Sequence, residues 1–295
     1  MYENCLLCPR NCGVDRNFSS GFCGEGAGLK AARAALHFWE EPPISGMNGS
    51  GTVFFSGCNL KCVYCQNSPI ARGSAGKEIT IARLAQIFLS LEKQNAHNIN
   101  LVTPTHFSPS IIEAVELSRK DGLSIPIVYN TGGYEKAEII KGLKGTCDIF
   151  LTDMKYIRPD TAAKYSNAPD YFEEASAALD EMVAIAPKIV LDENGIMQKG
   201  VIVRHLLLPG HLIEAKMIVK YLYDRYGDAI FISLMDQYTP VCRDTRFPEL
   251  HRTVTDYEYA SLISYAQALG VKNAFIQEKG TAKESFIPPF DLTGI

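Results

Sequence analysis

The chain has 295 residues, of which 46% are hydrophobic and 21% charged, a balance typical of a globular protein with one large domain or two smaller ones. The formal net charge is −4 and no dense Lys/Arg cluster occurs, so we expect no nucleic-acid partner. No run approaches the ~18 apolar residues of a membrane span, and residues 1–12 lack the pattern of a signal peptide. We therefore expect a cytoplasmic protein without a membrane partner.

The cysteines are unevenly distributed: seven of the nine lie within the first 65 residues, in two clusters. The cytoplasm keeps thiols reduced, and an odd number of closely spaced cysteines there favours metal ligation over disulfides. The first cluster has the spacing C-x2-C-x3-C-x10-C and consists of Cys5, Cys8, Cys12 and Cys23. Four thiolates at this spacing fit either a structural zinc site, which the neighbouring glycines favour, or a second, fully ligated 4Fe–4S cluster. We predict that residues 1–48 form a small cysteine-rich metal-binding module.

From residue 49 onward, short apolar runs alternate with longer helical patterns. The runs predict strands at 52–56, 98–102, 125–129, 148–152, 201–208, 229–233 and 273–277. Apolar residues at helical spacing predict helices around 81–91, 111–117 and 213–222, and the capping box Thr255-x-x-Glu258 begins a last one. This alternation predicts parallel strands with crossover helices, in about six units, fewer than the eight of a closed TIM barrel. Asn194-Gly195 predicts a hairpin that adds one antiparallel strand.

The second cysteine cluster is the segment SGCNLKCVYCQN at 56–67. Cys58, Cys62 and Cys65 have the spacing C-x3-C-x2-C, and Tyr64 precedes the last of them. Three thiolates can bind three irons of a 4Fe–4S cubane, and no fourth cysteine follows nearby, so the fourth iron keeps an open site that can chelate S-adenosylmethionine (SAM). The segment directly follows the first strand of the alternating region, at the end where active sites of parallel α/β folds gather. A zinc knuckle is the alternative interpretation.

This spacing, with an aromatic residue before the third cysteine, resembles the signature of the radical SAM superfamily. The longer stretch HFWEEPPISGMNGSGTVFFSGCNLKCVYCQN resembles a subgroup similar to pyruvate formate-lyase activating enzyme, and the likeness extends to the tail FIPPFDLTG at 286–294. The resemblance implies an α/β fold with a partial (β/α)6 TIM-like barrel over residues 49–295, a 4Fe–4S cluster, and SAM. It also implies reductive cleavage of SAM to a 5′-deoxyadenosyl radical, hydrogen abstraction from a protein glycyl residue or a small molecule, and a flavodoxin- or ferredoxin-type reductant.

The resemblance also suggests cofactor-binding residues after the second predicted strand. In the superfamily a Gly-Gly-Glu-like turn there binds the SAM amino group, whereas this chain has LVTPTHFSP at 101–109. Thr103 and Thr105 occupy the corresponding place and are the candidates for that contact. His106 is a candidate to bind SAM or substrate, and Tyr64 is expected to lie at the same site.

The next three strand ends carry further candidates. Asn130 and Thr131, in YNTGGYE, resemble the Thr-Asn-Gly turn of glycyl-radical activating enzymes, although an ordinary turn fits too. Asp153 and Lys155, in LTDMKY, resemble the Asp-x-Lys of those enzymes and face one side of an extended segment. Arg204, in VIVRHLLLPG, presents a fork suited to the carboxylate of SAM or substrate. Buried ion pairs are the alternative interpretation for Asp153, Lys155 and Arg204.

We expect an enzyme whose partner is a glycyl-radical enzyme or another protein substrate. The main alternative is a non-catalytic iron–sulfur electron carrier or a zinc-binding interaction module, and that reading leaves the open iron and the polar strand ends unexplained. A metal-dependent hydrolase would need histidine and carboxylate ligands at strand ends, but the six histidines show no metal-binding spacing.

Overall fold

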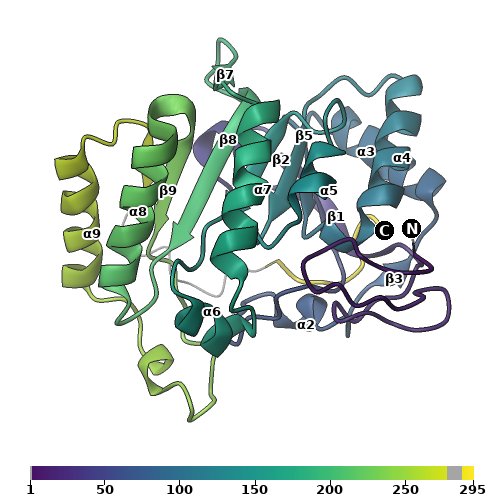
Figure 1. The fold of residues 1–295 in the computed structure, drawn as a ribbon. Helices are drawn as coiled ribbons and strands as arrows, with labels where there is room; N and C mark the ends of the chain where they lie inside the picture. The colour runs from purple at the N-terminus through teal and green to yellow at the C-terminus, as the bar shows by residue number, and fades with distance from the viewer. Residues whose placement is uncertain (1, 278–287) are drawn as a thin grey trace.

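The computed structural model describes residues 2–277 and 288–295, so the first two residues of the tail FIPPFDLTG lie outside the described residues. A ten-stranded sheet forms the centre of the molecule, with helices packed against it (Figure 1). The strands are β1 (Lys30–His37), β2 (Ser50–Phe55), β3 (Lys77–Glu78), β4 (Ile99–Val102), β5 (Ile127–Thr131), β6 (Ile149–Asp153), β7 (Val190–Leu191), β8 (Met197–Leu206), β9 (Phe231–Met235) and β10 (Ala274–Ile276). The α-helices are α1 (Pro42–Ser45), α2 (Ser68–Ala71), α3 (Ile81–Lys93), α4 (Ser108–Lys120), α5 (Ala137–Lys141), α6 (Pro159–Ser166), α7 (Tyr171–Ile185), α8 (Leu212–Tyr226) and α9 (Asp256–Leu269).

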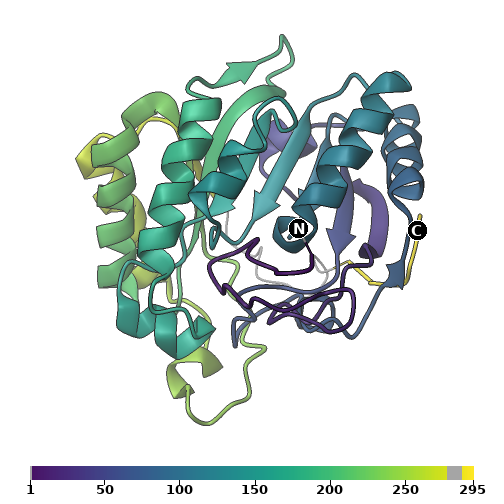
Figure 2. The same ribbon diagram turned by 45° about the vertical axis from the view of Figure 1, so that its right-hand side comes forward.

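The sheet is parallel over most of its width and open at its sides. Its order is β10-β9-β8-β6-β5-β4-β2-β1-β3, and the strands from β10 to β2 all run in one direction. β1 is antiparallel to β2, and β3 is antiparallel to β1. Within the described residues no pairing joins the outer strands β10 and β3. The predicted α/β fold with a partial barrel is confirmed, and Figure 2 shows the curved sheet from a second direction.

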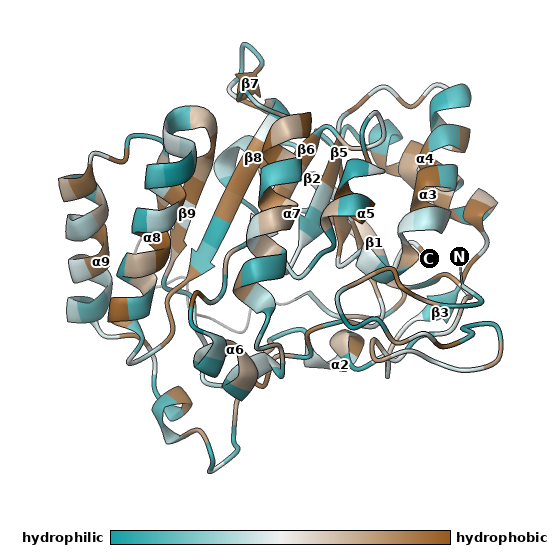
Figure 3. Cartoon of the chain, viewed as in Figure 1, coloured by the Kyte–Doolittle hydropathy of each residue, from teal (hydrophilic) through white to brown (hydrophobic). Residues whose placement is uncertain are grey.

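Alternation along the strands separates two faces of the sheet. Tyr129, Phe150 and Val203 belong to the large core that the sheet forms with the outer helices. Val128, Leu151 and Ile202, each one residue away along a strand, pack on the inner face around Ile44 of α1. Successive side chains of a strand point to opposite faces of the sheet, so consecutive apolar residues supply apolar side chains to both faces. The hydrophobic colouring along the strands is visible in Figure 3. Polar side chains of four neighbouring strands meet on the inner face near the carboxyl ends of the strands, and this places the candidate site there.

The predicted elements are present. Each of β2, β4, β5, β6, β8 and β9 is followed by a helix, as the six expected units require. The Asn194-Gly195 turn joins β7 and β8 as an antiparallel hairpin, with Gly195 at φ +77°. Thr255 and Glu258 form the capping box at the start of α9. No helix in the described ranges is long and apolar enough to cross a membrane.

The first 48 residues contribute two elements that the sequence analysis missed, strand β1 and the short helix α1. Strand β1 pairs with β2 along nearly its whole length, so residues 30–37 are part of the main sheet. Residues 2–29 form no helix or strand and lie at the carboxyl ends of the strands, on the lower side of the molecule in Figure 1. The division of the chain at residue 48 stays a prediction.

Candidate functional site

The three cysteines that follow β2 lie together at one cavity. Cys58, Cys62 and Cys65 all belong to the cysteine loop, residues 56–67, and all three line a cavity of about 150 Å³ at the carboxyl ends of the parallel strands. The loop leaves the sheet through Gly57, whose φ of +84° suits glycine. A Cβ at Gly57 would come within 2.5 Å of the Glu25 side chain, so the close approach of the N-terminal segment also requires a glycine.

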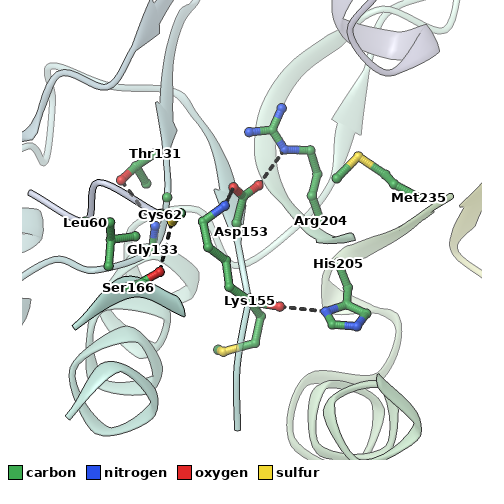
Figure 4. Close-up of polar contacts among 12 residues, drawn as sticks. Leu60, Cys62, Thr131, Gly133, Asp153, Lys155, Ser166, Arg204, His205 and Met235 are labelled. Carbon is green, nitrogen blue, oxygen red and sulfur yellow. Dashed lines mark hydrogen bonds and ion pairs between the residues drawn. The ribbon is translucent and has the colours of Figure 1, made fainter. Parts of the chain in front are cut away.

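Two of these sulfur atoms receive hydrogen-bond donors. The backbone N–H of Leu60 donates to Sγ of Cys58 over 3.4 Å. The hydroxyl of Ser166 donates to Sγ of Cys62 over 3.0 Å (Figure 4). Such donors stabilise negative charge on sulfur, which is the form that binds metal.

The electrostatic behaviour of the thiols shows that the sulfur atoms influence one another. Burial raises the pKa of Cys65 to about 12, and the neighbouring Cys62 thiol adds to that rise. Burial also raises the pKa of Cys58, again with Cys62 as the next contributor. At neutral pH the free thiols of Cys58 and Cys65 are therefore protonated, and metal binding must displace those protons.

A network of charged groups forms another wall of the same cavity. Nε of Arg204 lies 2.8 Å from Oδ1 of Asp153, and Nζ of Lys155 lies 2.5 Å from Oδ2 of the same carboxylate (Figure 4). Nη2 of Arg204 donates to the side-chain oxygen of Asn130 over 2.6 Å. Burial alone would raise the pKa of Asp153, but Arg204 and Lys155 outweigh it and hold that pKa below its ordinary value. The four predicted residues thus form one preorganised polar surface facing the cysteines.

Glu40 completes this network, and the sequence analysis missed it. Its Oε2 lies 3.1 Å from Nη1 of Arg204, and its Oε1 accepts hydrogen bonds of 3.1 Å from both Asn100 and Asn130. Glu40 comes from the stretch between β1 and α1, which enters the inner face of the sheet from far along the chain. No periodic pattern marks this residue; its presence in the stretch HFWEEPPISG, which carries the resemblance to the activating-enzyme subgroup, was the local signal.

The ends of β4 and β5 supply a second group of hydrogen bonds. Thr103, Thr105 and Thr131 line the cavity, and the hydroxyls of Thr105 and Thr131 both donate to Oε1 of Glu135. Thr103 has φ +59°, a left-handed conformation that β-branched residues rarely adopt and that is concentrated at functional sites. Burial raises the pKa of Glu135 to about 7, although the hydroxyl donors lower it in part. Glu135 was not among the predicted residues.

Tyr64 and His106 lie behind the cavity and are not among its lining residues. The Tyr64 hydroxyl is 2.7 Å from that of Tyr156, inside the aromatic core. Nε2 of His106 is 2.6 Å from the carbonyl of Ser56, and burial lowers the pKa of His106 to about 3. The imidazole of His106 is therefore neutral and buried, and its hydrogen bond to Ser56 supports the start of the cysteine loop.

The N-terminal cysteines lie outside this cavity but next to the cysteine loop. The N–H of Cys58 donates to the carbonyl of Cys23 over 3.2 Å. Cys5, Cys8 and Cys23 are buried, whereas Cys12 is half-buried. In the described part of the chain no three His, Cys, Asp or Glu side chains are placed to hold a single metal ion. Three thiolates on a cubane each bind a different iron, so the loop cysteines need not surround one point.

Arg10 and Arg16 tie the N-terminal segment to the rest of the site. Nε of Arg10 donates to the carbonyl of Asn59 in the cysteine loop over 2.7 Å, and Nη2 donates to the carbonyl of Ser166 over 2.9 Å. Arg16 is buried, and its Nη1 lies 2.5 Å from the carbonyl of His106 and 3.9 Å from Sγ of Cys5. Half-buried Arg10 thus holds the loop, and buried Arg16 places positive charge beside Cys5, a candidate metal ligand.

Two curated proteins resemble the chain in sequence. Uncharacterized protein MJ0674 of Methanocaldococcus jannaschii is 28% identical over 279 residues, which cover 90% of this chain and 75% of that protein. The pyruvate formate-lyase-activating enzyme of Clostridium pasteurianum is 30% identical over 113 residues, which cover 37% of this chain and 46% of the enzyme.

Among solved structures, Streptococcus suis SuiB bound to the precursor peptide SuiA matches 76% of this chain with a TM-score of 0.49 and 10% identity. SuiB bound to S-adenosylmethionine matches with a TM-score of 0.48 and 12% identity. The chain spans about half the length of these two structures, 47% and 48% respectively. The family model of the radical SAM superfamily matches residues 52–221, which include the three cysteines of the loop and the strands from β4 to β8. The chain therefore belongs to the radical SAM superfamily.

Proposed function

We propose that this chain is an enzyme that holds a 4Fe–4S cluster on Cys58, Cys62 and Cys65, binds SAM there, and abstracts hydrogen from a protein glycyl residue or a small molecule. Membership of the superfamily implies the cluster and SAM. The observation that carries the proposal is the convergence of three cysteines and the polar ends of four neighbouring strands on one cavity. When bound, the cluster and SAM supply one-electron cleavage of SAM to methionine and a 5′-deoxyadenosyl radical, which takes a hydrogen atom from the substrate.

The donor set of the cavity fits this cofactor. Cys58, Cys62 and Cys65 offer three thiolates, and the described lining of the cavity contains no fourth cysteine. The N–H of Leu60 and the hydroxyl of Ser166 compensate part of the negative charge on two of the sulfur atoms. Three side chains then serve as ligands, and one iron is left for SAM.

The polar wall suits the amino acid part of SAM. We assign the SAM carboxylate to Lys155 or Arg204, and the SAM amine or ribose to Asp153. Because Asp153 and Glu40 both hold the guanidinium of Arg204, its orientation is fixed before the ligand arrives. Thr103, Asn130 and Thr131, which line the same cavity, are the candidates for further SAM contacts. Tyr64 and His106 support the loop in this proposal and do not touch SAM.

We further propose that Cys5, Cys8, Cys12 and Cys23 bind a metal centre, either zinc or an auxiliary 4Fe–4S cluster. A single zinc ion would require these thiols to move together on binding, because no three of them are placed around one point among the described residues. Four thiolates around either centre carry net negative charge, and buried Arg16 lies beside Cys5 to balance it. The sequence likeness to an activating enzyme favours a glycyl-radical enzyme as partner and a flavodoxin- or ferredoxin-type reductant. Metal analysis and absorbance of a Cys5→Ala variant beside a Cys58→Ala variant separate the two centres.

Anaerobic reconstitution tests the proposed activity. With dithionite and SAM, the protein should yield 5′-deoxyadenosine and methionine in equal amounts, while Cys58→Ala should yield neither. Cys242→Ala is the matched control, because Cys242 is a buried cysteine outside the cavity, and it should retain the activity. A protein that carries the cluster but forms no 5′-deoxyadenosine would be an electron carrier. Transfer of deuterium from candidate substrates into 5′-deoxyadenosine then identifies the hydrogen that is abstracted.

A further inference from the structure

A series of cavities leads away from the cysteine loop along the inner face of the sheet. The cavity at the cysteines shares Asn130 and Arg204 with a second cavity of about 220 Å³. The second shares Trp39 and Glu40 with a third cavity of about 340 Å³. The third, which we call the side cavity, lies at β9 and β10, and its further lining residues include Glu41, Ser233, Met235 and Phe275. The three cavities therefore adjoin one another, and the side cavity lies next to the site at the cysteines.

The side cavity contains a buried carboxyl group with an unused oxygen. Glu41 is only 8% exposed and lines the cavity, and its Oε2 has no hydrogen-bond partner among the described residues. A buried carboxylate without a partner is costly, so such a group is kept where a ligand or a reaction uses it. Burial raises the pKa of Glu41, and the neighbouring Glu40 opposes its ionisation, whereas Arg204 favours it. Burial outweighs Arg204 and the Ser233 hydroxyl, so the pKa of Glu41 stays above its ordinary value unless a further cation approaches it.

Arg204 cannot supply that charge alone. Its Nη1 and Nε pair with Glu40 and Asp153, and its Nη2 donates to Asn130. Among the described residues, the charged groups of this region are three carboxyl groups, on Glu40, Glu41 and Asp153, and two cations, on Lys155 and Arg204. Within this described set the carboxyl groups outnumber the cations by one.

The remaining lining residues of the side cavity indicate what kind of ligand group it would bind. Phe275, Ile276 and Met235 present apolar surface, and Trp39 presents an indole ring. Apolar walls accommodate a methylene chain, and an aromatic face attracts an organic cation. An alkyl chain that ends in an ammonium group matches both the walls and the carboxyl group of Glu41.

We propose that the side cavity binds an alkylammonium group of the substrate, with Glu41 as its counter-ion and Trp39, Met235 and Phe275 around its methylene chain. This inference rests on the proposed function, because it names part of the substrate of that site. Glu41 is a positioning residue here: it places the substrate and takes no part in hydrogen abstraction.

Binding of simple probes to the anaerobically purified full chain tests the side cavity without SAM cleavage. Trp39 is the single tryptophan of the chain, so its fluorescence reports on occupancy of this cavity, and calorimetry gives the affinity independently. At pH 7.5 we expect n-pentylamine to bind at least tenfold more tightly than 1-pentanol and to change the Trp39 emission. We expect Glu41→Gln to weaken pentylamine binding about tenfold, the equivalent of about 1.4 kcal/mol, and to leave pentanol binding unchanged. Glu116→Gln, an exposed glutamate on α4, removes the same charge elsewhere and should bind like the unaltered chain.

Equal binding of pentylamine and pentanol to the unaltered chain overturns the proposal, and this comparison needs no variant to fold. A second pair of probes, an acetylated Gly-Lys-Gly amide and its norleucine counterpart, separates the two sources of an alkylammonium group. Tighter binding of the lysine peptide than of pentylamine supports a protein side chain, and the reverse supports a free amine. If the protein binds pentylamine more tightly than pentanol but forms no 5′-deoxyadenosine, the proposal for the side cavity stands and the proposed function is wrong. If the protein cleaves SAM but does not prefer the amine, only the proposal for the side cavity is wrong.

Discussion

Replacement of Glu135 by glutamine is expected to change how the stability of the protein depends on pH. Glu135 is fully buried, and burial raises its pKa from 4.5 to about 7. In the unfolded chain the carboxyl group ionises near pH 4.5, while in the folded chain it keeps its proton up to about pH 7. The folded state therefore binds more protons in this window, and stability is lost as pH rises through it.

The size of the effect follows from the shift in pKa. A shift from 4.5 to about 7 corresponds to a total loss on the order of 3 kcal/mol, since each unit is worth about 1.4 kcal/mol. Between pH 6 and pH 8 the expected part of this loss is about 1.3 kcal/mol. In Glu135→Gln this part should disappear. The difference in the free energy of unfolding between the unaltered chain and the variant should therefore change by about 1.3 kcal/mol from pH 6 to pH 8.

Urea unfolding of the metal-free protein at pH 6, 7 and 8 measures this difference. Metal-free protein is used so that acid- or base-induced loss of a cluster does not enter the comparison. Other titrating groups are shared by both proteins and cancel, and Glu116→Gln, which removes an exposed carboxyl group, should follow the unaltered chain. Parallel pH profiles of the unaltered chain and Glu135→Gln would refute the reasoning.

Three further substitutions test other contacts of the site. Arg204→Met removes the cation that pairs with Glu40 and one of the two cations that pair with Asp153, which keeps Lys155. It should lower the free energy of unfolding by about 3 kcal/mol in urea titrations, and a loss below about 1 kcal/mol would contradict the buried network. Arg10→Met removes the charged donor to the carbonyl of Asn59, so a chelator should abolish the iron–sulfur absorbance about tenfold faster than in the unaltered chain. Arg10→Lys should show an intermediate rate. Equal rates in all three proteins would show that the N-terminal segment does not hold the loop. Tyr64→Phe removes one hydroxyl of a buried hydrogen-bonded pair and should cost about 1 kcal/mol of stability, while the SAM affinity measured by calorimetry stays unchanged. Weaker SAM binding would place Tyr64 at the cofactor after all.

The strands and most of the cavity were predictable because local sequence patterns encode them. Strands such as TVFFS and DIFLT carry several apolar residues in succession because both faces of the parallel sheet are covered. The carboxyl ends of neighbouring parallel strands meet at one edge, so Asn130, Asp153 and Arg204 could be placed together from the sequence. Their hydrogen bonds and ion pairs in the structure agree with that placement, while their roles toward SAM stay predictions.

The rest depends on contacts between segments far apart in the chain. β1 has the sequence KAARAALH, and its alanines carry little strand propensity, so its place beside β2 is decided by packing. Glu40 and Glu41 look like part of a polar linker, yet the adjoining α1 inserts Ile44 into the inner core and brings both glutamates inside. His106 follows a strand end as catalytic histidines do, but the approach of the N-terminal segment buries it beneath the cysteine loop.

The central claim is that the protein leaves one iron of its cluster open for SAM. The most direct measurement is electron–nuclear double resonance on the reduced protein with SAM labelled with 15N at its amino group. The account predicts a strong coupling between the label and the reduced cluster, present in the unaltered chain and in Cys5→Ala and absent in Cys58→Ala. A reduced cluster whose spectrum shows no coupling to labelled SAM would contradict it.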